Sequence, residues 1–264
     1  MTGPVAPAGG RHPGRIDLNA DVGESFGPWP MGWDAELIPH LSSVNVACGV
    51  HAGDPTTIRR TVEAAVAAGA AIGAHPGYPD LLGFGRREMA LSSAEIEDTV
   101  LYQIAAVAGI VRVHGGTLAH VKPHGALYHR ATVDPVAAAA IAAAIAAFDP
   151  ALPVVTPPGS ALAAAAEARG MAWVGEAFID RAYDPDGGLR ARADGGLHAD
   201  PAVVAAQAVE IARDGMITTT DGSRIALPAG SLCIHGDTPG AVAIARATRD
   251  ALAAAGFEVT PPGR

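Results

Sequence analysis

Short apolar runs recur along the chain, and most of them stop abruptly at polar residues, glycine or proline. We predict seven strands from these runs. They cover residues 16–20, a run that starts at residue 44, and residues 70–74, 117–122, 152–156, 172–175 and 231–234. Continuous apolar runs of this length are typical of strands buried on both faces, as in a parallel sheet.

Helices are predicted between these strands, and two of them carry clear start signals. Asp54-Pro55 precedes an amphipathic segment over residues 56–69, with the aspartate as N-cap and the proline in the first turn. Ser92 and Glu95 are spaced as in a capping box. Further helices are expected to begin near residues 135, 160, 201 and 239. We interpret Asp237 as the N-cap of the last one.

Seven strand-then-helix units predict a parallel α/β sheet, and both an open doubly wound sheet and a closed barrel satisfy that alternation. An open sheet gathers its site at one switch point, whereas nearly every strand here ends in polar residues. A ring of loops around a barrel mouth requires that distribution. We therefore predict a TIM-like (β/α) barrel with seven strands.

The composition fits one large domain. Of 264 residues, 49% are hydrophobic and 17% are charged, which is enough apolar surface for one core. We predict a flexible N-terminal tail over residues 1–14, a single barrel domain over residues 15–258 and a C-terminal tail over residues 259–264. The first segment is rich in proline and glycine and lacks the apolar core of a signal peptide or transmembrane helix.

Charge and cysteine content narrow the range of partners. The net charge of -9 and the pI of about 5.5 argue against nucleic acid and membranes, because both require clustered lysine and arginine. Cys48 and Cys233 lie in apolar runs, and we interpret them as small buried fillers rather than nucleophiles. This cysteine usage suits a reduced, cytoplasmic protein.

Carboxylates and histidines at the predicted strand ends are the first candidate catalytic residues. Asp21 follows the first strand, and His51 and His75 follow the next two. These three side chains are candidates for positioning a water molecule and for holding a divalent metal ion, since sets of histidine and carboxylate favour such ions. A rim of hydrogen-bonded histidines explains them equally well. Asp17, earlier in the first strand, is assigned a structural role.

Lys122 and His124 follow the fourth strand. A lysine at the end of a barrel strand is costly to bury unless it is paired or binds an anion. We therefore assign Lys122 a catalytic role, as a positive charge that stabilises a developing oxyanion or a transferred phosphoryl group. His124, in a proline-glycine turn, is a further catalytic candidate, and bracing the loop is its alternative role.

Three arginines are candidates for binding a substrate carboxylate through two hydrogen bonds. Arg86 and Arg87 lie in a glycine-spaced loop, and Arg181 follows the sixth strand, where Asp180 beside it also invites an internal ion pair. We expect one of the two loop arginines to hold the substrate. Arg192 lies in a loop without a motif, and we expect its replacement by alanine to have little effect.

Six segments at the strand ends form a recognisable series: residues 16–25, 45–54, 73–87, 120–128, 176–183 and 233–237. These segments resemble the LamB/YcsF family, the A subunits of 5-oxoprolinase, and the resemblance extends from about residue 15 to residue 256. Val50 and Ile179 replace the phenylalanine and the alanine expected at these positions. Both are apolar exchanges that leave the polar residues of the motifs intact.

The resemblance implies a seven-stranded barrel related to the glycoside hydrolase and deacetylase superfamily. It also implies ATP-dependent opening of 5-oxo-L-proline (pyroglutamate) to L-glutamate, with ATP as co-substrate and two partner subunits, B and C. Within the matching motifs we assign Asn19, Glu24 and Asn45 to substrate binding.

The residues themselves agree with part of this implication. Opening a lactam requires charge stabilisation at the carbonyl oxygen, an activated water and a proton for the leaving nitrogen. However, the sequence has no G-x-x-x-x-G-K-[ST] phosphate loop, so ATP is expected to bind through the partners or at an unfamiliar site. Two other functions stay open: a stand-alone metal-dependent hydrolase of the deacetylase type, and a non-catalytic subunit that binds substrate.

Overall fold

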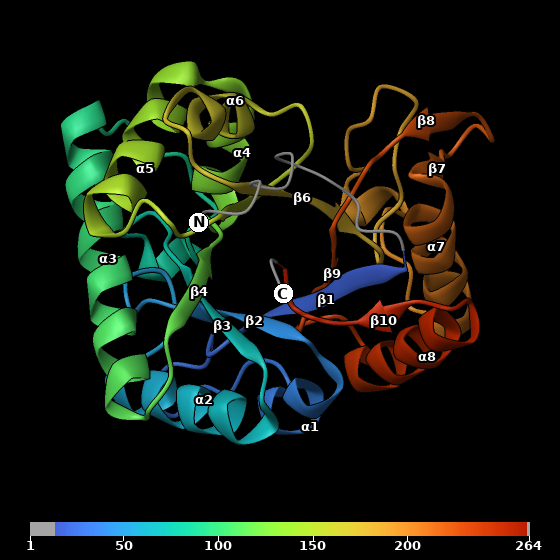
Figure 1. The fold of residues 1–264 in the computed structure, drawn as a ribbon, viewed down its shortest axis with the longest axis horizontal. Coiled ribbons are helices and arrows are strands. Elements are labelled where there is room, and N and C mark those ends of the chain that lie inside the picture. The colour runs from blue at the N-terminus through green and yellow to red at the C-terminus, as the bar shows by residue number, and fades with distance from the viewer. Residues whose placement is uncertain (1–13, 263–264) are drawn as a thin grey trace, which may run out of the picture.

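Seven parallel strands close into a barrel in the computed structural model, which describes residues 14–262 (Figure 1). The strands are β1 (Arg15–Val22), β2 (Ser43–Ala47), β3 (Ala71–His75), β4 (Leu118–Val121), β5 (Val154–Thr156), β6 (Trp173–Phe178) and β9 (Ser231–Ile234). Strand β9 pairs with both β6 and β1, which closes the ring. The predicted seven-stranded barrel is therefore confirmed.

Helices surround the barrel and cover its outer face (Figure 1). They are α1 (Asp34–Leu37), α2 (Pro55–Ala68), α3 (Ser93–Val113), α4 (Gly125–Val133), α5 (Pro135–Phe148), α6 (Ala161–Ala168), α7 (Pro201–Asp214) and α8 (Ala241–Ala254). Short 3-10 turns add η1 (Ile38–His40), η2 (Leu81–Gly83) and η3 (Arg192–Asp194).

The predicted helix starts at Asp54 and Ser92 are confirmed by their hydrogen bonds. The Asp54 carboxylate accepts from the backbone N–H groups of Thr56 and Thr57. Ser92 and Glu95 form the reciprocal bonds of a capping box at the start of α3. These side chains satisfy backbone donors that a helix start otherwise leaves unpaired. They fix where the chain leaves each strand-end loop.

Some elements were not predicted. Helix α4 begins immediately after the His124 loop, and an antiparallel hairpin of β7 (Met216–Thr218) and β8 (Arg224–Ala226) lies outside the barrel. Strand β10 (Glu258–Val259) pairs with the start of β1. Most of the predicted tails, residues 1–13 and 263–264, lie outside the described residues. The cap assigned to Asp237 was wrong, because α8 begins later and Gly240 is its N-cap.

A buried carboxylate joins three adjacent strands where the barrel closes. Asp17 of β1 accepts hydrogen bonds from the hydroxyl groups of Ser42, Ser43 and Ser231, at 2.7 Å from Ser42 and 2.9 Å from Ser43. Burial raises the pKa of Asp17 to about 6, although these hydrogen bonds oppose the shift. The contacts agree with the structural role expected for Asp17.

Among residues 14–262, no single helix has both the length and the apolar composition to cross a membrane. Helices α4 and α5 meet the criterion only as a pair, and the chain bends by 115° between them.

Candidate active site

Lys122, the only lysine in the chain, lies at the centre of the carboxyl end of the barrel. Its ammonium nitrogen Nζ is 2.9 Å from Oδ1 of Asp21 and 2.8 Å from Oε1 of Glu176, and the side chain is 2% exposed. Burial alone would lower the pKa of Lys122, but the Asp21 and Glu176 carboxylates raise it well above its usual range. The lysine is therefore a fixed positive charge.

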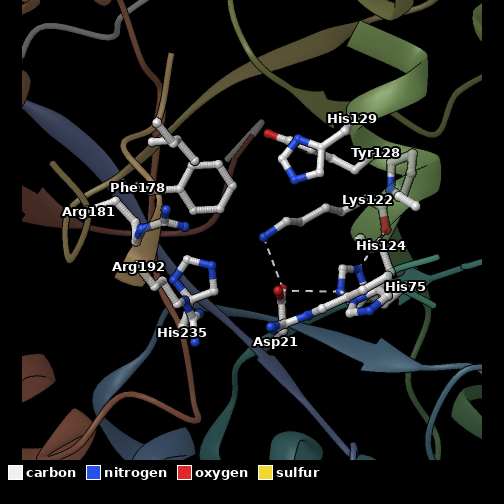
Figure 2. Close-up of a pocket in the computed structure, with 15 residues that line it drawn as sticks. Asp21, His75, Lys122, His124, Tyr128, His129, Phe178, Arg181, Arg192 and His235 are labelled. Carbon is white, nitrogen blue, oxygen red and sulfur yellow. Dashed lines mark hydrogen bonds and ion pairs between the residues drawn. The ribbon is translucent and has the colours of Figure 1, made fainter. Parts of the chain in front are cut away.

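Asp21 connects the lysine to the histidines. Its Oδ1 atom accepts from Lys122, and its Oδ2 atom is 3.3 Å from Nε2 of His75 (Figure 2). Oδ1 also accepts from the side-chain amide of Asn45, at 2.9 Å. Burial opposes ionisation, but the adjacent His75 ring and the ammonium group of Lys122 hold the pKa of Asp21 well below its usual range. Asp21 thus presents an ionised carboxylate to the pocket.

Beneath this layer, two buried amides fix the carboxylates. Asn19 donates to Oε1 of Glu176 at 3.2 Å, and Asn45 donates to Asn19 and to Asp21. Both amides are buried inside the barrel and do not line the pocket. The structure therefore places Asn19 and Asn45 behind the site, where they orient its charged groups, rather than against a substrate.

Glu176 and Tyr128 extend the polar network, and neither was among our candidates. The Tyr128 hydroxyl donates to Oε2 of Glu176 at 2.7 Å. Burial and the adjacent Glu176 raise the pKa of Tyr128 well above its usual range, so its hydroxyl keeps its proton. Glu176 lies next to the predicted strand 172–175, and that position was the available signal.

A second cluster, formed by Glu24, His51, His75 and His124, adjoins Asp21. One ligand atom from each residue lies within 4.8 Å of the others, so these four side chains could hold a metal ion. Burial and the neighbouring histidines lower the pKa of His51 well below its usual range and that of His124 to about 3. The cluster therefore contains neutral imidazoles.

Arginines line the opposite wall of the pocket, and Figure 2 shows Arg181 and Arg192, together with His235, facing the lysine and the histidines. Arg86 also lines this pocket. Asp237 contacts two of these arginines, with Oδ2 at 3.0 Å from Arg192 and 3.7 Å from Arg86. One carboxylate therefore faces several guanidinium groups, and the wall can accept a further anion.

Arg87 and Arg192 lie differently from what the sequence suggested. Arg87 does not line the pocket, because its guanidinium is bound by Asp80. Arg192, expected to be unimportant, faces the pocket. The internal ion pair expected between Asp180 and Arg181 is also absent from the contacts of residues 14–262.

Asp180 instead binds His235 and so positions that ring. The Oδ1 atom of Asp180 is 2.9 Å from Nδ1 of His235, and Thr238 donates to Oδ2 at 2.6 Å. The His235 ring stacks on Phe178, with 5.2 Å between ring centroids. His235 directly follows the predicted strand 231–234, so its position was the signal that could have placed it in the site.

These groups enclose a pocket of about 310 Å³ at the carboxyl ends of the strands. Of the predicted site residues, it brings together Asp21, His75, Arg86, Lys122, His124 and Arg181. His51 and Glu24 join through the histidine cluster. Sites of this kind suit small polar metabolites, because a few fixed charges set the orientation of the ligand.

The fold and the site define a class of protein: a parallel barrel with a lysine held between carboxylates and a cluster of histidines at its mouth. The chain belongs to the LamB/YcsF family, whose match spans residues 16–264.

Individual relatives are similar over nearly their whole length. The chain is 52% identical to the A subunit of 5-oxoprolinase from Methylococcus capsulatus, over 94% of this chain and 96% of the relative. It is 50% identical to the A subunit of 5-oxoprolinase from Nocardia farcinica, over 92% and 98%. The crystal structure of the lactam utilization protein from Thermus thermophilus superposes with a TM-score of 0.89 at 48% identity, covering 93% and 99%.

Proposed function

We propose that this chain is the A subunit of an ATP-dependent 5-oxoprolinase in the cytoplasm. In this proposal it opens 5-oxoproline to L-glutamate together with the B and C subunits, while ATP is hydrolysed to ADP and phosphate. The observation that carries the proposal is the buried Lys122, held by Asp21 and Glu176 below a wall of arginines. Relatives about half identical to this chain are named as A subunits of 5-oxoprolinase.

The substrate has two features that match the two walls of the pocket. Its carboxylate suits Arg86, Arg181 and Arg192, because guanidinium groups bind carboxylates through paired, charge-assisted hydrogen bonds. Its lactam carbonyl then points towards the ammonium group of Lys122. The arginine wall thus orients the ring, and the lysine meets the bond that is broken.

In the proposed reaction, water adds to the lactam carbonyl carbon and the carbon–nitrogen bond breaks. Lys122 stabilises the negative charge that develops on the carbonyl oxygen, as a charge fixed before the reaction begins. Asp21, which lies beside both Lys122 and His75, holds the attacking water and accepts its proton. The released nitrogen takes up a proton and becomes the amino group of glutamate.

ATP enters the proposal through the partner subunits. The sequence contains no conventional phosphate loop. In this proposal the arginines of the pocket bind the substrate carboxylate and Lys122 faces the lactam carbonyl, so these cations are not available for ATP. We therefore assign the nucleotide site to the assembled complex and not to this barrel alone. This assignment distinguishes the chain from a stand-alone hydrolase, which would open the lactam without ATP.

The test is a glutamate-release assay with 5-oxoproline and ATP, using the chain alone and the chain with both partner subunits. We expect turnover only in the assembled complex. Lys122→Met combined with Glu176→Gln should reduce it at least about a hundredfold, because the oxyanion loses its fixed charge. The double variant removes the Lys122 ammonium group together with the charge of Glu176. Folding stability is then reduced less than in a variant that leaves both carboxylates buried without the lysine.

The matched control is Arg59→Ala, which removes an exposed ion pair with Glu63 on α2 and should leave turnover unchanged. Glutamate release by the isolated chain without ATP would favour the metal-dependent hydrolase instead. Full turnover by the Lys122 and Glu176 double variant would indicate that the chain only binds substrate for its partners.

A further inference from the structure

The histidine cluster beside the pocket contains more hydrogen-bond acceptors than donors. Its members come from four different loops or strand ends: Glu24 after β1, His51 after β2, His75 at the end of β3 and His124 after β4. The hydrogen bonds on the outer sides of two rings determine which nitrogen atoms carry protons.

For His75, the outer nitrogen is the donor. Its Nδ1 atom is 2.7 Å from the backbone carbonyl oxygen of Lys122, and a carbonyl oxygen only accepts. Nδ1 therefore carries a proton, and in the neutral form of the ring Nε2 presents a lone pair. That Nε2 atom points into the cluster.

For His124, the same reasoning applies with the two nitrogens exchanged. Its Nε2 atom is 2.8 Å from the backbone carbonyl oxygen of Phe84, so Nε2 is the donor and Nδ1 carries the lone pair. Nδ1 of His124 lies 3.0 Å from Nε2 of His75. Two lone pairs therefore face each other across a distance at which one of them would ordinarily be a donor.

Two carboxylates add further acceptors at the same place. Oδ2 of Asp21 is 3.3 Å from Nε2 of His75, and Oε1 of Glu24 is 3.7 Å from Nδ1 of His124. Neither carboxylate donates when ionised. The centre of the cluster is therefore a set of acceptor atoms that requires a cation between them.

His51 supplies an independent observation. It is fully buried, and neither of its ring nitrogens has a hydrogen-bond partner in the described part of the chain. Its ring stacks on that of His124, with 3.9 Å between centroids and 6° between planes. A buried imidazole without any partner is rare in proteins and indicates a missing ligand.

From this geometry we infer that Glu24, His51, His75 and His124 form a binding site for a single divalent transition-metal ion of the zinc type. Three imidazole nitrogens and one carboxylate oxygen favour zinc or cobalt over magnesium or calcium, which prefer oxygen ligands. Two ligands of a tetrahedral zinc ion lie about 3.4 Å apart. The spacings from Nδ1 of His124, 3.0 Å to His75 and 3.7 Å to Glu24, lie on either side of that value.

The outer hydrogen bonds of His75 and His124 suit this role, because metal-bound histidines typically donate their second N–H to a carbonyl or carboxylate oxygen. Phe84 is the only non-glycine residue with positive φ, 56°, among residues 14–262, and this conformation directs its carbonyl oxygen at His124. The site differs from the metal set expected from the sequence. His124 and Glu24 enter it, whereas Asp21 is already bound by Lys122 and Asn45 on Oδ1.

An ion at this position would act as a Lewis acid beside Asp21 at the edge of the substrate pocket. The inference does not depend on the identity of the substrate, because the allocation of protons and the unpartnered His51 stand without it. A failure of the 5-oxoprolinase assay would therefore leave the metal site open to test. Likewise, a failure to bind metal would leave the proposed 5-oxoprolinase function open to test.

The experiment uses the full chain after treatment with a chelator, titrated with Zn²⁺ and with Co²⁺ alone. We expect one equivalent to bind, a visible d–d absorption band for Co²⁺, and a rise in melting temperature with Zn²⁺ because the ion binds the folded state. His124→Gln and Glu24→Gln should weaken binding about a hundredfold or more, since the loss of groups that only support a metal ligand already costs roughly 10- to 100-fold.

Two controls keep the result decisive. His114→Ala removes a histidine at the end of α3 that pairs with Glu63 and is not a member of the cluster, and this variant should bind one equivalent as the unmodified chain does. Circular dichroism of each metal-free variant checks that it folds. The inference would be overturned if the unmodified chain bound neither ion, or if the cluster variants bound as tightly as the unmodified chain. A proton shared between His75 and His124 would then explain their close approach.

Discussion

Lys122 shows how a single residue can set the electrostatics of a pocket. Its two carboxylate partners come from β1 and β6, which flank β9 in the ring, so the lysine, which follows β4, is held from strands across the barrel mouth. Lys122 and Asp21 could be predicted from the sequence because a charge at the end of a barrel strand requires a partner. Glu176 also lies at a strand end, but its pairing with the lysine could not be predicted, because which acids approach the lysine depends on barrel closure rather than on local sequence.

The arginines show the same limit at the residue scale. Arg86 and Arg87 are neighbours in the same loop, yet one lines the pocket and the other binds Asp80. Arg192 reaches the pocket from a loop that carries no motif. Side-chain direction in a loop depends on long-range contacts, and no local pattern in the sequence encodes them.

Asp17 provides a prediction about pH at this scale. Its pKa is raised from 3.8 to about 6 in the folded protein, mainly by burial. The folded state therefore holds a proton that the unfolded state loses between about pH 4 and pH 6. Stability from this group is fully present below pH 4 and falls as the pH rises to 6, by roughly 3 kcal/mol.

Asp17→Asn removes this titration and retains a polar group among the three serines. The free energy of unfolding of the variant, minus that of the unmodified chain, should rise by roughly 3 kcal/mol between pH 4 and pH 7. Urea denaturation of both proteins across that pH range measures this difference in unfolding free energy. Other titrating groups are present in both proteins, so their contributions cancel. Parallel profiles for the two proteins would contradict the assigned pKa shift.

Among the elements, those with strong local signals were predicted and those without them were missed. The barrel strands are continuous apolar runs, and α2 and α3 have side-chain caps at Asp54 and Ser92. Helix α4 is nine residues long, and its N-cap, His124, makes no side-chain capping bond. The hairpin of β7 and β8 has no partner in the barrel, so the strand-then-helix alternation gives no indication of it.

Gly77, in the loop after β3, gives a prediction about how the elements meet. A Cβ atom at this position would lie 2.7 Å from Nδ1 of His51. Gln103 of α3 holds the Gly77 backbone through two hydrogen bonds of 2.9 Å, so His51 must move instead. We expect Gly77→Ala to weaken Co²⁺ binding at least about tenfold while the protein remains folded.

Gly109, in the last two turns of α3, is the matched control. A Cβ atom at this position would meet no atom of another element within 4 Å among the described residues, so Gly109→Ala should preserve metal binding. It should also stabilise the protein by about 0.5–1 kcal/mol through helix propensity. Co²⁺ titration and thermal unfolding of both variants separate the two effects. Unchanged Co²⁺ affinity in Gly77→Ala would argue against His51 as a ligand.

At the scale of the whole molecule, the charge at the pocket differs in sign from the net charge of the chain. The chain carries a net charge of -9, yet Arg86, Arg181 and Arg192 gather at the pocket, where Asp237 pairs with Arg86 and Arg192. An anionic substrate therefore meets a local positive region on an acidic protein. Such a region raises the local concentration of anions, and its effect depends on ionic strength.

This arrangement predicts which arginine matters and how salt acts. Arg192→Ala should weaken binding of 5-oxoproline about tenfold, because it removes a charge-assisted contact that is partly screened by solvent. Arg87→Ala should change affinity little, since that guanidinium is bound by Asp80.

Raising the salt concentration from about 0.05 M to 0.5 M should weaken binding of 5-oxoproline to the unmodified chain more than to Arg192→Ala, because the Debye length falls below about 5 Å. Calorimetry on the three proteins measures both effects, and equal losses in the two arginine variants would refute this role for Arg192.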